Sequence, residues 1–231
     1  MLQFRFSPDW FYGIDSIFEI VSIIVALLIA FSSYKIYKFT KEAKYKYFSL
    51  SFVLIAIAYV FKILTNFTLF RQSIIEKTIG DLTYTFLAIQ KSDIFLILGY
   101  LLFRFLMLIG LIGIYLILDK QSKQTEVNKR IIVLLTFFAF ITAMISHYYF
   151  IIFHITAALL LGFITYLFYN NCKKKCTQTS RLVSTAFLII FISQLLFILV
   201  QFNTEFYVVA EVFQLLGFII LLITYFLVLR K

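Results

Sequence analysis

Long apolar stretches alternate with short polar segments along this chain. Five stretches have the length of about 20 mostly apolar residues that a membrane-spanning helix requires. They cover residues 13–34, 47–66, 93–118, 182–201 and 206–229. We therefore predict membrane-spanning helices over all five ranges.

A sixth apolar region, 131–169, is too long for a single span. It has 39 residues and contains no Lys, Arg, Asp or Glu. As one helix it would be roughly 58 Å long, nearly twice the hydrocarbon core of a bilayer. We expect it to fold back at residues 146–149, which gives spans over 131–146 and 149–169. The pattern thus predicts seven helices, with an external loop over 67–92.

Composition places the chain among integral membrane proteins. It is 63% hydrophobic and only 14% charged, whereas soluble domains are typically about 45–50% apolar and about 25% charged. Two Cys are too few for a disulfide scaffold, and one Pro with seven Gly excludes collagen-like and disordered classes. We predict an all-α membrane protein, with residues 1–231 forming a single polytopic domain.

The basic residues predict the orientation of these spans. Fifteen of them fall in the segments after the first, third, fifth and seventh spans, while four fall on the opposite side. Short basic loops stay in the cytoplasm. We therefore expect an external N-terminus, a cytoplasmic C-terminus and a multi-pass protein of the cytoplasmic membrane. The net charge of +10 then reflects loops that face lipid headgroups, and we expect no nucleic-acid partner.

A faint internal repeat accompanies this topology. At an offset of 135 positions, Tyr34 falls on Tyr169 and Lys38 on Lys173. The first three and last three helices also share an orientation, with the fourth left over as a linker, as in parallel-repeat membrane folds with a 3+1+3 arrangement. Duplication and chance similarity between apolar helices both fit these matches.

Polar residues inside the predicted spans are the candidate site. Ionisable groups in a membrane are costly and usually face the bundle interior. We predict an outward-facing polar pocket whose ligand-binding residues are Glu19, Lys62, Arg104, His154, Gln194, Glu211 and Gln214. Arg104 is the deepest charge, and an ion pair with Glu19 or Glu211 would offset its cost. Alternatively, these residues only hold the helices together through hydrogen bonds.

Several function classes are disfavoured by what the sequence lacks. The predicted spans contain no Pro, although broken-helix transporters rely on such interruptions. The last span has no Lys to carry a retinal, and no motif typical of hydrolases, metalloproteases or nucleotide-binding loops is found. We therefore expect a non-enzymatic protein with no catalytic residues, no cofactor and no metal site.

The segment 37–52, YKFTKEAKYKYFSLSF, joins a basic turn to a helix start rich in Tyr and Phe. In this it resembles small, uncharacterised seven-helix membrane proteins of archaeal type. In architecture alone, the chain resembles the seven-helix sensor modules that precede bacterial histidine kinases. It differs from those modules because it ends two residues after its last span, so no kinase is expected to follow.

These observations favour a sensor or receptor-like module that binds a small polar or anionic ligand. Arg104 and Lys62 would contact the anion, and a cytoplasmic or membrane protein partner, or anionic lipid, would receive the output. Alternatives are a small solute or ion carrier or channel that uses the same pocket, and a structural subunit of a larger complex. An apolar plug below Arg104 would argue against transport; its expected residues are Leu108, Leu111, Phe218 and Leu222.

Overall fold

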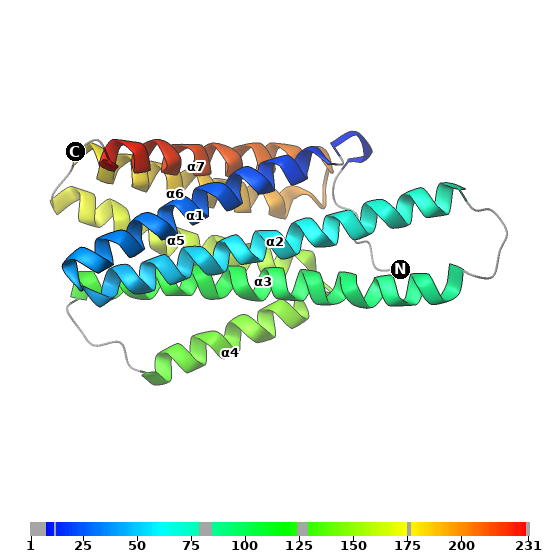
Figure 1. Cartoon of the computed structure of the whole chain (residues 1–231), viewed down its shortest axis with the longest axis horizontal. Coiled ribbons are helices and arrows are strands. Elements are labelled where there is room, and N and C mark those ends of the chain that lie inside the picture. The colour runs from blue at the N-terminus through cyan, green and yellow to red at the C-terminus, as the bar shows by residue number, and fades with distance from the viewer. Residues whose placement is uncertain (1–7, 12, 79–84, 124–128, 175–176, 230–231) are drawn as a thin grey trace.

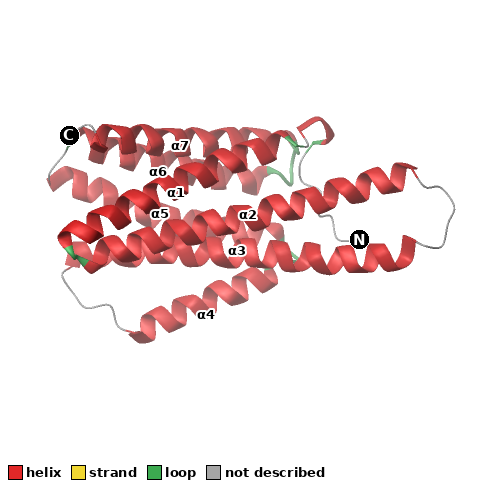
Figure 2. Ribbon diagram, viewed as in Figure 1, coloured by secondary structure: helices red, strands yellow, loops and turns green. Residues whose placement is uncertain are grey.

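The computed structural model describes residues 8–11, 13–78, 85–123, 129–174 and 177–229. Every regular element in these ranges is helical (Figures 1 and 2). A single 3-10 turn, η1, covers Asp9–Phe11. The α-helices are α1 (Ile14–Thr40), α2 (Ala43–Thr78), α3 (Thr85–Lys123), α4 (Lys129–Ile145), α5 (Phe150–Lys174), α6 (Gln178–Leu199) and α7 (Glu205–Leu229). The predicted all-α architecture with seven helices is confirmed.

Six of the seven helices are long and apolar enough to cross a membrane. These are α1, α2, α3, α5, α6 and α7, whose apolar segments have 22 to 27 residues. The remaining helix, α4, has 17 residues and is about 26 Å long at 1.5 Å per residue. It is therefore shorter than a typical hydrocarbon core of about 30 Å.

The six long helices form a closed ring, and α4 lies outside it. Neighbours around the ring are α1, α2, α3, α5, α6 and α7, with α7 returning to α1. α4 contacts α3 and α5 only from the outer side (Figure 1). The consecutive positions Ile131 to Leu134 at its start are all at least 40% exposed, so this end of α4 makes little contact with the ring.

The chain folds back between α4 and α5 where the sequence predicted it. The backbone N–H of Ser146 donates to the carbonyl of Thr142 at 2.9 Å, and that of Tyr149 donates to Ile145 at 3.2 Å. These bonds close the last turn of α4 and leave residues 146–149 as a turn before α5 starts. The fold-back follows from length, since one continuous helix would far exceed the bilayer.

The predicted external loop over 67–92 is wrong for most of its length. α2 continues to Thr78 and α3 already begins at Thr85, so helix replaces loop on both sides of residues 79–84, which lie outside the described residues. In Figure 1 the two helices extend together beyond the ends of their neighbours. The segment 67–78 has no Pro or Gly to end a helix, and the apolar pattern that defined the span says nothing about where a solvated helix stops.

Small residues let the helices approach closely. A Cβ at Gly110 of α3 would lie 2.6 Å from Cγ1 of Ile55 and 3.0 Å from the carbonyl oxygen of Ser51, both on α2. Gly217 of α7 is similarly closed off by Ile190 of α6. Without a hydrophobic force between helices in lipid, such close packing contributes much of their association.

Candidate functional site

The predicted site residues all lie inside the bundle. Their exposed fractions do not exceed 8%. They come from six helices and are Glu19, Lys62, Arg104, His154, Gln194, Glu211 and Gln214. The predicted inward orientation is therefore confirmed, and in this conformation the surrounding helices shield each of these side chains from solvent.

The first group of contacts centres on the Lys62 ammonium. Its Nζ lies 2.7 Å from Oε1 of Glu211 and 2.9 Å from Oε1 of Glu19. Asn66, one turn further along α2, donates from Nδ2 to Glu19 Oε1 at 3.1 Å and to Asp15 Oδ2 at 3.4 Å. We call these five residues the ion cluster. It connects α1, α2 and α7 and satisfies several buried polar atoms at once.

Local helix geometry explains why these side chains meet. Residues four apart project from the same face of a helix, which aligns Asp15 with Glu19 on α1 and Lys62 with Asn66 on α2. Asp15 also accepts hydrogen bonds through Oδ1 from the backbone N–H of Gly13 at 3.0 Å and of Ser16 at 2.8 Å. A carboxylate at a helix N-terminus is favoured by the free N–H groups there, so Asp15 also stabilises the start of α1.

The second group is a chain of hydrogen bonds across α5, α6 and α7. His154 Nδ1 lies 2.8 Å from Oε1 of Gln194, and Gln194 Nε2 donates to Oε1 of Gln214 at 3.0 Å. The His154 ring stacks on Phe197 with centroids 4.7 Å apart. We call His154, Gln194 and Gln214 the amide chain. Its groups pair with one another, which fits a structural hydrogen-bonded role.

Arg104 belongs to neither group, so its predicted ion pair with Glu19 or Glu211 is wrong. Its Nη1 donates to the carbonyl oxygen of Ser146 at 2.6 Å and to Ser146 Oγ at 3.2 Å. Among the described residues, no carboxylate lies within 4.0 Å of the guanidinium. Lys62 pairs with both glutamates instead. Arg104 extends from α3 toward the α4–α5 turn, where it contacts Ser146.

The surroundings of Arg104 are aromatic and partly polar. Its guanidinium carbon lies 5.5 Å from the centre of the Tyr100 ring, a cation–π distance. His147, in the α4–α5 turn, has a pKa below its ordinary value of 6.5, because of burial and then because of the positive charge of Arg104. Arg104 is thus a buried cation whose described hydrogen-bond partners are uncharged.

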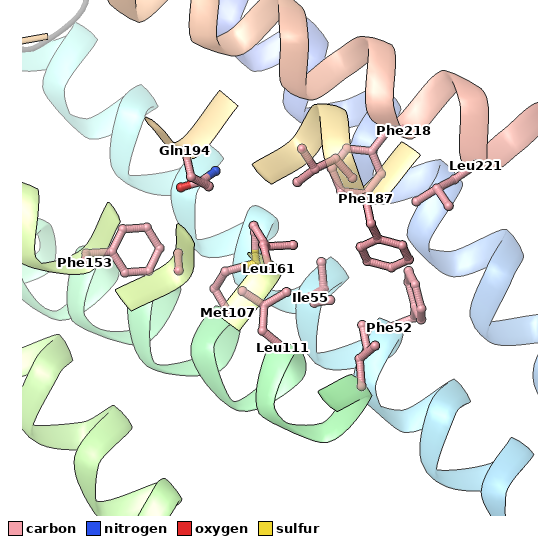
Figure 3. A pocket seen from close by; sticks show the side chains of 13 residues that line it. Phe52, Ile55, Met107, Leu111, Phe153, Leu161, Phe187, Gln194, Phe218 and Leu221 are labelled. Atoms are coloured by element: carbon pink, nitrogen blue, oxygen red, sulfur yellow. The ribbon is translucent and has the colours of Figure 1, made fainter. Parts of the chain in front are cut away.

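An apolar cavity of about 30 Å³ lies in the centre of the ring. Figure 3 shows Phe153, Met107, Leu111, Phe187 and Phe218 around it, with Gln194 at one side. Gln194 contributes the only amide among the lining side chains, and its described partners are His154 and Gln214. The cavity is large enough for about two water molecules by volume, but it offers them few polar partners.

The residues expected to block a transport path are packed into the core. Leu108, Leu111 and Phe218 are each at most 4% exposed, and Leu222 packs against the same core. We call these four residues the apolar plug. In this part of the ring the helices pack against one another through apolar side chains.

Asp15, Asn66 and Ser146 are the site residues that the prediction left out. Asp15 carries a signal in the sequence, since it precedes Glu19 by four positions on the same helix face. Asn66 carries a signal in the sequence, since it follows Lys62 by four positions on the same polar face. Ser146 carries none, because the shorter hydrogen bond from Arg104 goes to its backbone carbonyl, which any residue type would supply. Its role depends on where the α4–α5 turn packs.

The six apolar helices, together with ionic contacts buried between them, indicate a multi-pass helical membrane protein. Comparison with protein-family models, with curated proteins and with solved structures finds no match for the chain. Among the described residues, no group of three or more His, Cys, Asp or Glu is arranged to hold a metal ion.

Proposed function

We propose that the protein crosses the cytoplasmic membrane seven times, with its N-terminus outside and its C-terminus inside. Successive helices run in opposite directions, and the helix ends beside the predicted basic loops lie together at the left of Figure 1. This arrangement supports a common cytoplasmic side for those loops. α4 would cross as a short span, with the basic residues before it reaching the headgroups.

The position of α4 also supports a 3+1+3 repeat. α1, α2 and α3 are consecutive in the ring, as are α5, α6 and α7, and α4 is the helix outside it. A linker helix between two three-helix units would occupy that place. A solved structure in which one unit superposes on the other would establish the duplication.

We infer that the protein is a non-enzymatic sensor or receptor-like module for a small anionic ligand, with Arg104 as the main contact. One observation carries this inference: Arg104 is 6% exposed, yet its described hydrogen bonds go only to Ser146. A buried charge without a counter-charge is costly. A small anion would supply that counter-charge, whereas Lys62 already has two carboxylate partners.

The apolar plug favours a sensor over a carrier or channel. A transported anion would have to pass hydrocarbon packed between several ring helices, and a buried charge there has no compensating partner. A structural subunit is the second candidate, and the self-contained pairing of the ion cluster and amide chain favours it. This second candidate does not explain why the buried charge of Arg104 has no counter-charge among the described residues.

The contact between Arg104 and Ser146 suggests how a signal would leave the site. An anion bound to the guanidinium would compete with the Ser146 carbonyl, which belongs to the turn at the end of α4. α4 is the helix outside the ring, and its first turns are the most exposed part of it. A shift of α4 would therefore change the basic cytoplasmic surface that a partner protein or anionic lipid contacts.

Thermal unfolding of the purified full chain tests the anion site. Inorganic phosphate, sulfate, acetate and nitrate are compared at equal ionic strength. We expect at least one of them to raise the melting temperature, since a ligand that binds only the folded state stabilises it. Arg104→Gln should abolish the rise, while Arg181→Gln, which changes an exposed arginine, should keep it.

Circular dichroism of Arg104→Gln establishes that the variant still folds. Ser146→Ala gives a second test, because it removes only the hydroxyl and keeps the guanidinium. We expect this variant to respond to the anion at least as strongly as the unmutated protein. If none of the four anions stabilises the unmutated protein, the anion site is wrong and the structural role is favoured.

A further inference from the structure

The ion cluster contains more acidic groups than basic ones. Glu19 and Glu211 share the single Lys62 ammonium, and Asp15 is joined to Glu19 through Asn66. With all groups ionised, the two glutamates and the lysine alone carry one excess negative charge. The side chains of both glutamates are no more than 1% exposed, so water cannot screen that charge.

An excess charge of this kind is expensive in the interior of a membrane protein. Burying an isolated carboxylate is costly even after relaxation of the surroundings, and two carboxylates that share a site cannot both ionise freely. Asn66 offsets part of the cost through hydrogen bonds to Glu19, but an amide carries no charge. Glu19, Glu211 and Lys62 taken together therefore need one further positive charge.

A buried hydroxyl next to the cluster points to the same conclusion. Tyr59 lies one turn before Lys62 on α2 and is 1% exposed, yet its hydroxyl has no hydrogen-bond partner among the described residues. This hydroxyl is within electrostatic range of Lys62, Glu211 and Glu19. A buried unpaired hydroxyl is uncommon and gives the cluster a neighbour that can donate or accept a hydrogen bond when a proton moves.

We propose that Glu19 and Glu211 form a proton-binding site in which one of the two carboxyl groups carries a proton. The proton makes the group of Glu19, Glu211 and Lys62 neutral without changing its contacts. This site is separate from the anion site at Arg104, and the inference does not depend on the proposed function.

The geometry favours a proton over a metal cation as the bound species. The Lys62 ammonium already occupies the space between the two glutamates at 2.7 and 2.9 Å. Asn66 turns its NH₂ group, which cannot coordinate a cation, toward Glu19. Sodium would need several oxygen atoms at short distances and would have to displace the ammonium, whereas a proton needs no additional volume.

Other titratable groups surround the pair on each packed element, and the test must separate them from it. On the described residues these are Asp15 on α1, Tyr59 and Lys62 on α2, Tyr100 on α3, His154 on α5 and Tyr207 on α7. Asp15 is the only further carboxyl group in this set. Isotope labelling of glutamate distinguishes its signal from that of the pair.

Infrared spectroscopy of the reconstituted full chain tests the proposal. A protonated carboxylic acid has a carbonyl stretch distinct from that of a carboxylate. We expect the unmutated protein to show this band near neutral pH, to shift it when glutamate is carbon-13 labelled, and to lose it as the pH is raised. Glu19→Gln and Glu211→Gln should each lack the band, because each leaves one carboxylate for one ammonium.

Glu42→Gln is the matched control, since Glu42 pairs with Lys44 at 2.6 Å on the surface, and it should keep the band. The proposal is overturned if the folded unmutated protein has no labelled glutamic acid band at any pH, or if the band survives in either cluster variant. Loss of the band when sodium replaces choline at constant pH would show a metal cation instead. The carbon-13 shift of the band in the unmutated protein tests the proposal even if one of the variants fails to fold.

Discussion

Lys62 and Glu211 are joined by an ion pair of 2.7 Å although 149 positions separate them in the sequence. The pair connects α2 to α7 on opposite sides of α1, and both side chains are almost fully buried. For a buried ion pair, removing one partner costs much more free energy of unfolding than the intact pair contributes to net stability. The consequences are best measured by removing one partner at a time.

Lys62→Met should strongly destabilise the bundle. It leaves Glu19 and Glu211 facing each other without a cation, which costs about 3–5 kcal/mol at a fully buried pair. We expect a large drop in melting temperature at neutral pH and a smaller one in acid, where the carboxylates take up protons. Lys44→Met breaks an exposed pair and should stay within about 1 kcal/mol of the unmutated protein. Equal melting temperatures for the two variants would contradict this prediction.

Gln194→Leu should destabilise the contacts among α5, α6 and α7. Gln194 stands in the middle of the amide chain, so its loss removes the bonds to both His154 and Gln214. Each buried polar group left unpaired costs about 1–3 kcal/mol. Gln201→Leu changes an exposed glutamine on the same part of the chain and serves as the control. Thermal unfolding in one detergent compares them, and a neutral Gln194→Leu would show that the amide chain does not hold these helices.

Gly110→Ala should weaken the packing of α2 on α3. The new Cβ would approach Ile55 Cγ1 to 2.6 Å and the Ser51 carbonyl oxygen to 3.0 Å, so the helices must separate. Overpacking of this kind costs about 1–3 kcal/mol. Gly162→Ala is the control, since its nearest new neighbour, Phe191, is 3.4 Å away. We expect it to be neutral, and similar melting temperatures for both variants would count against close packing at Gly110.

His147 should titrate below 6.5 in the folded protein. Burial lowers its pKa, and the positive Arg104 lowers it further. The folded state then binds fewer protons than the unfolded state, so this residue's contribution to stability is complete above about pH 6.5 and declines as the pH falls below it. Nuclear magnetic resonance of histidine-labelled protein measures the pKa. Arg104→Gln should raise it, and a value at or above 6.5 in the unmutated protein would refute the account.

The helical layout could be read from the sequence because it follows from local chemistry. The absence of charge over 131–169 and the thickness of a bilayer are enough to require a fold-back in this region, and the polar Ser146 and His147 indicate its position. The inward faces were equally accessible, since Asp15 and Glu19, or Lys62 and Asn66, lie one turn apart on the same helix. The end of α2 was not, because residues 67–78 mix polar and apolar types that suit a helix and a loop alike.

The sequence by itself determined that the chain forms seven helices and that the ionisable side chains inside them face inward. Both follow from the cost of exposing backbone and charge to lipid, which depends on each segment alone. Only the tertiary structure decided that Lys62 rather than Arg104 meets the two glutamates, and that α4 lies outside the ring. These depend on the rotation, tilt and depth of each helix against its neighbours, which are set by side-chain packing such as that at Gly110.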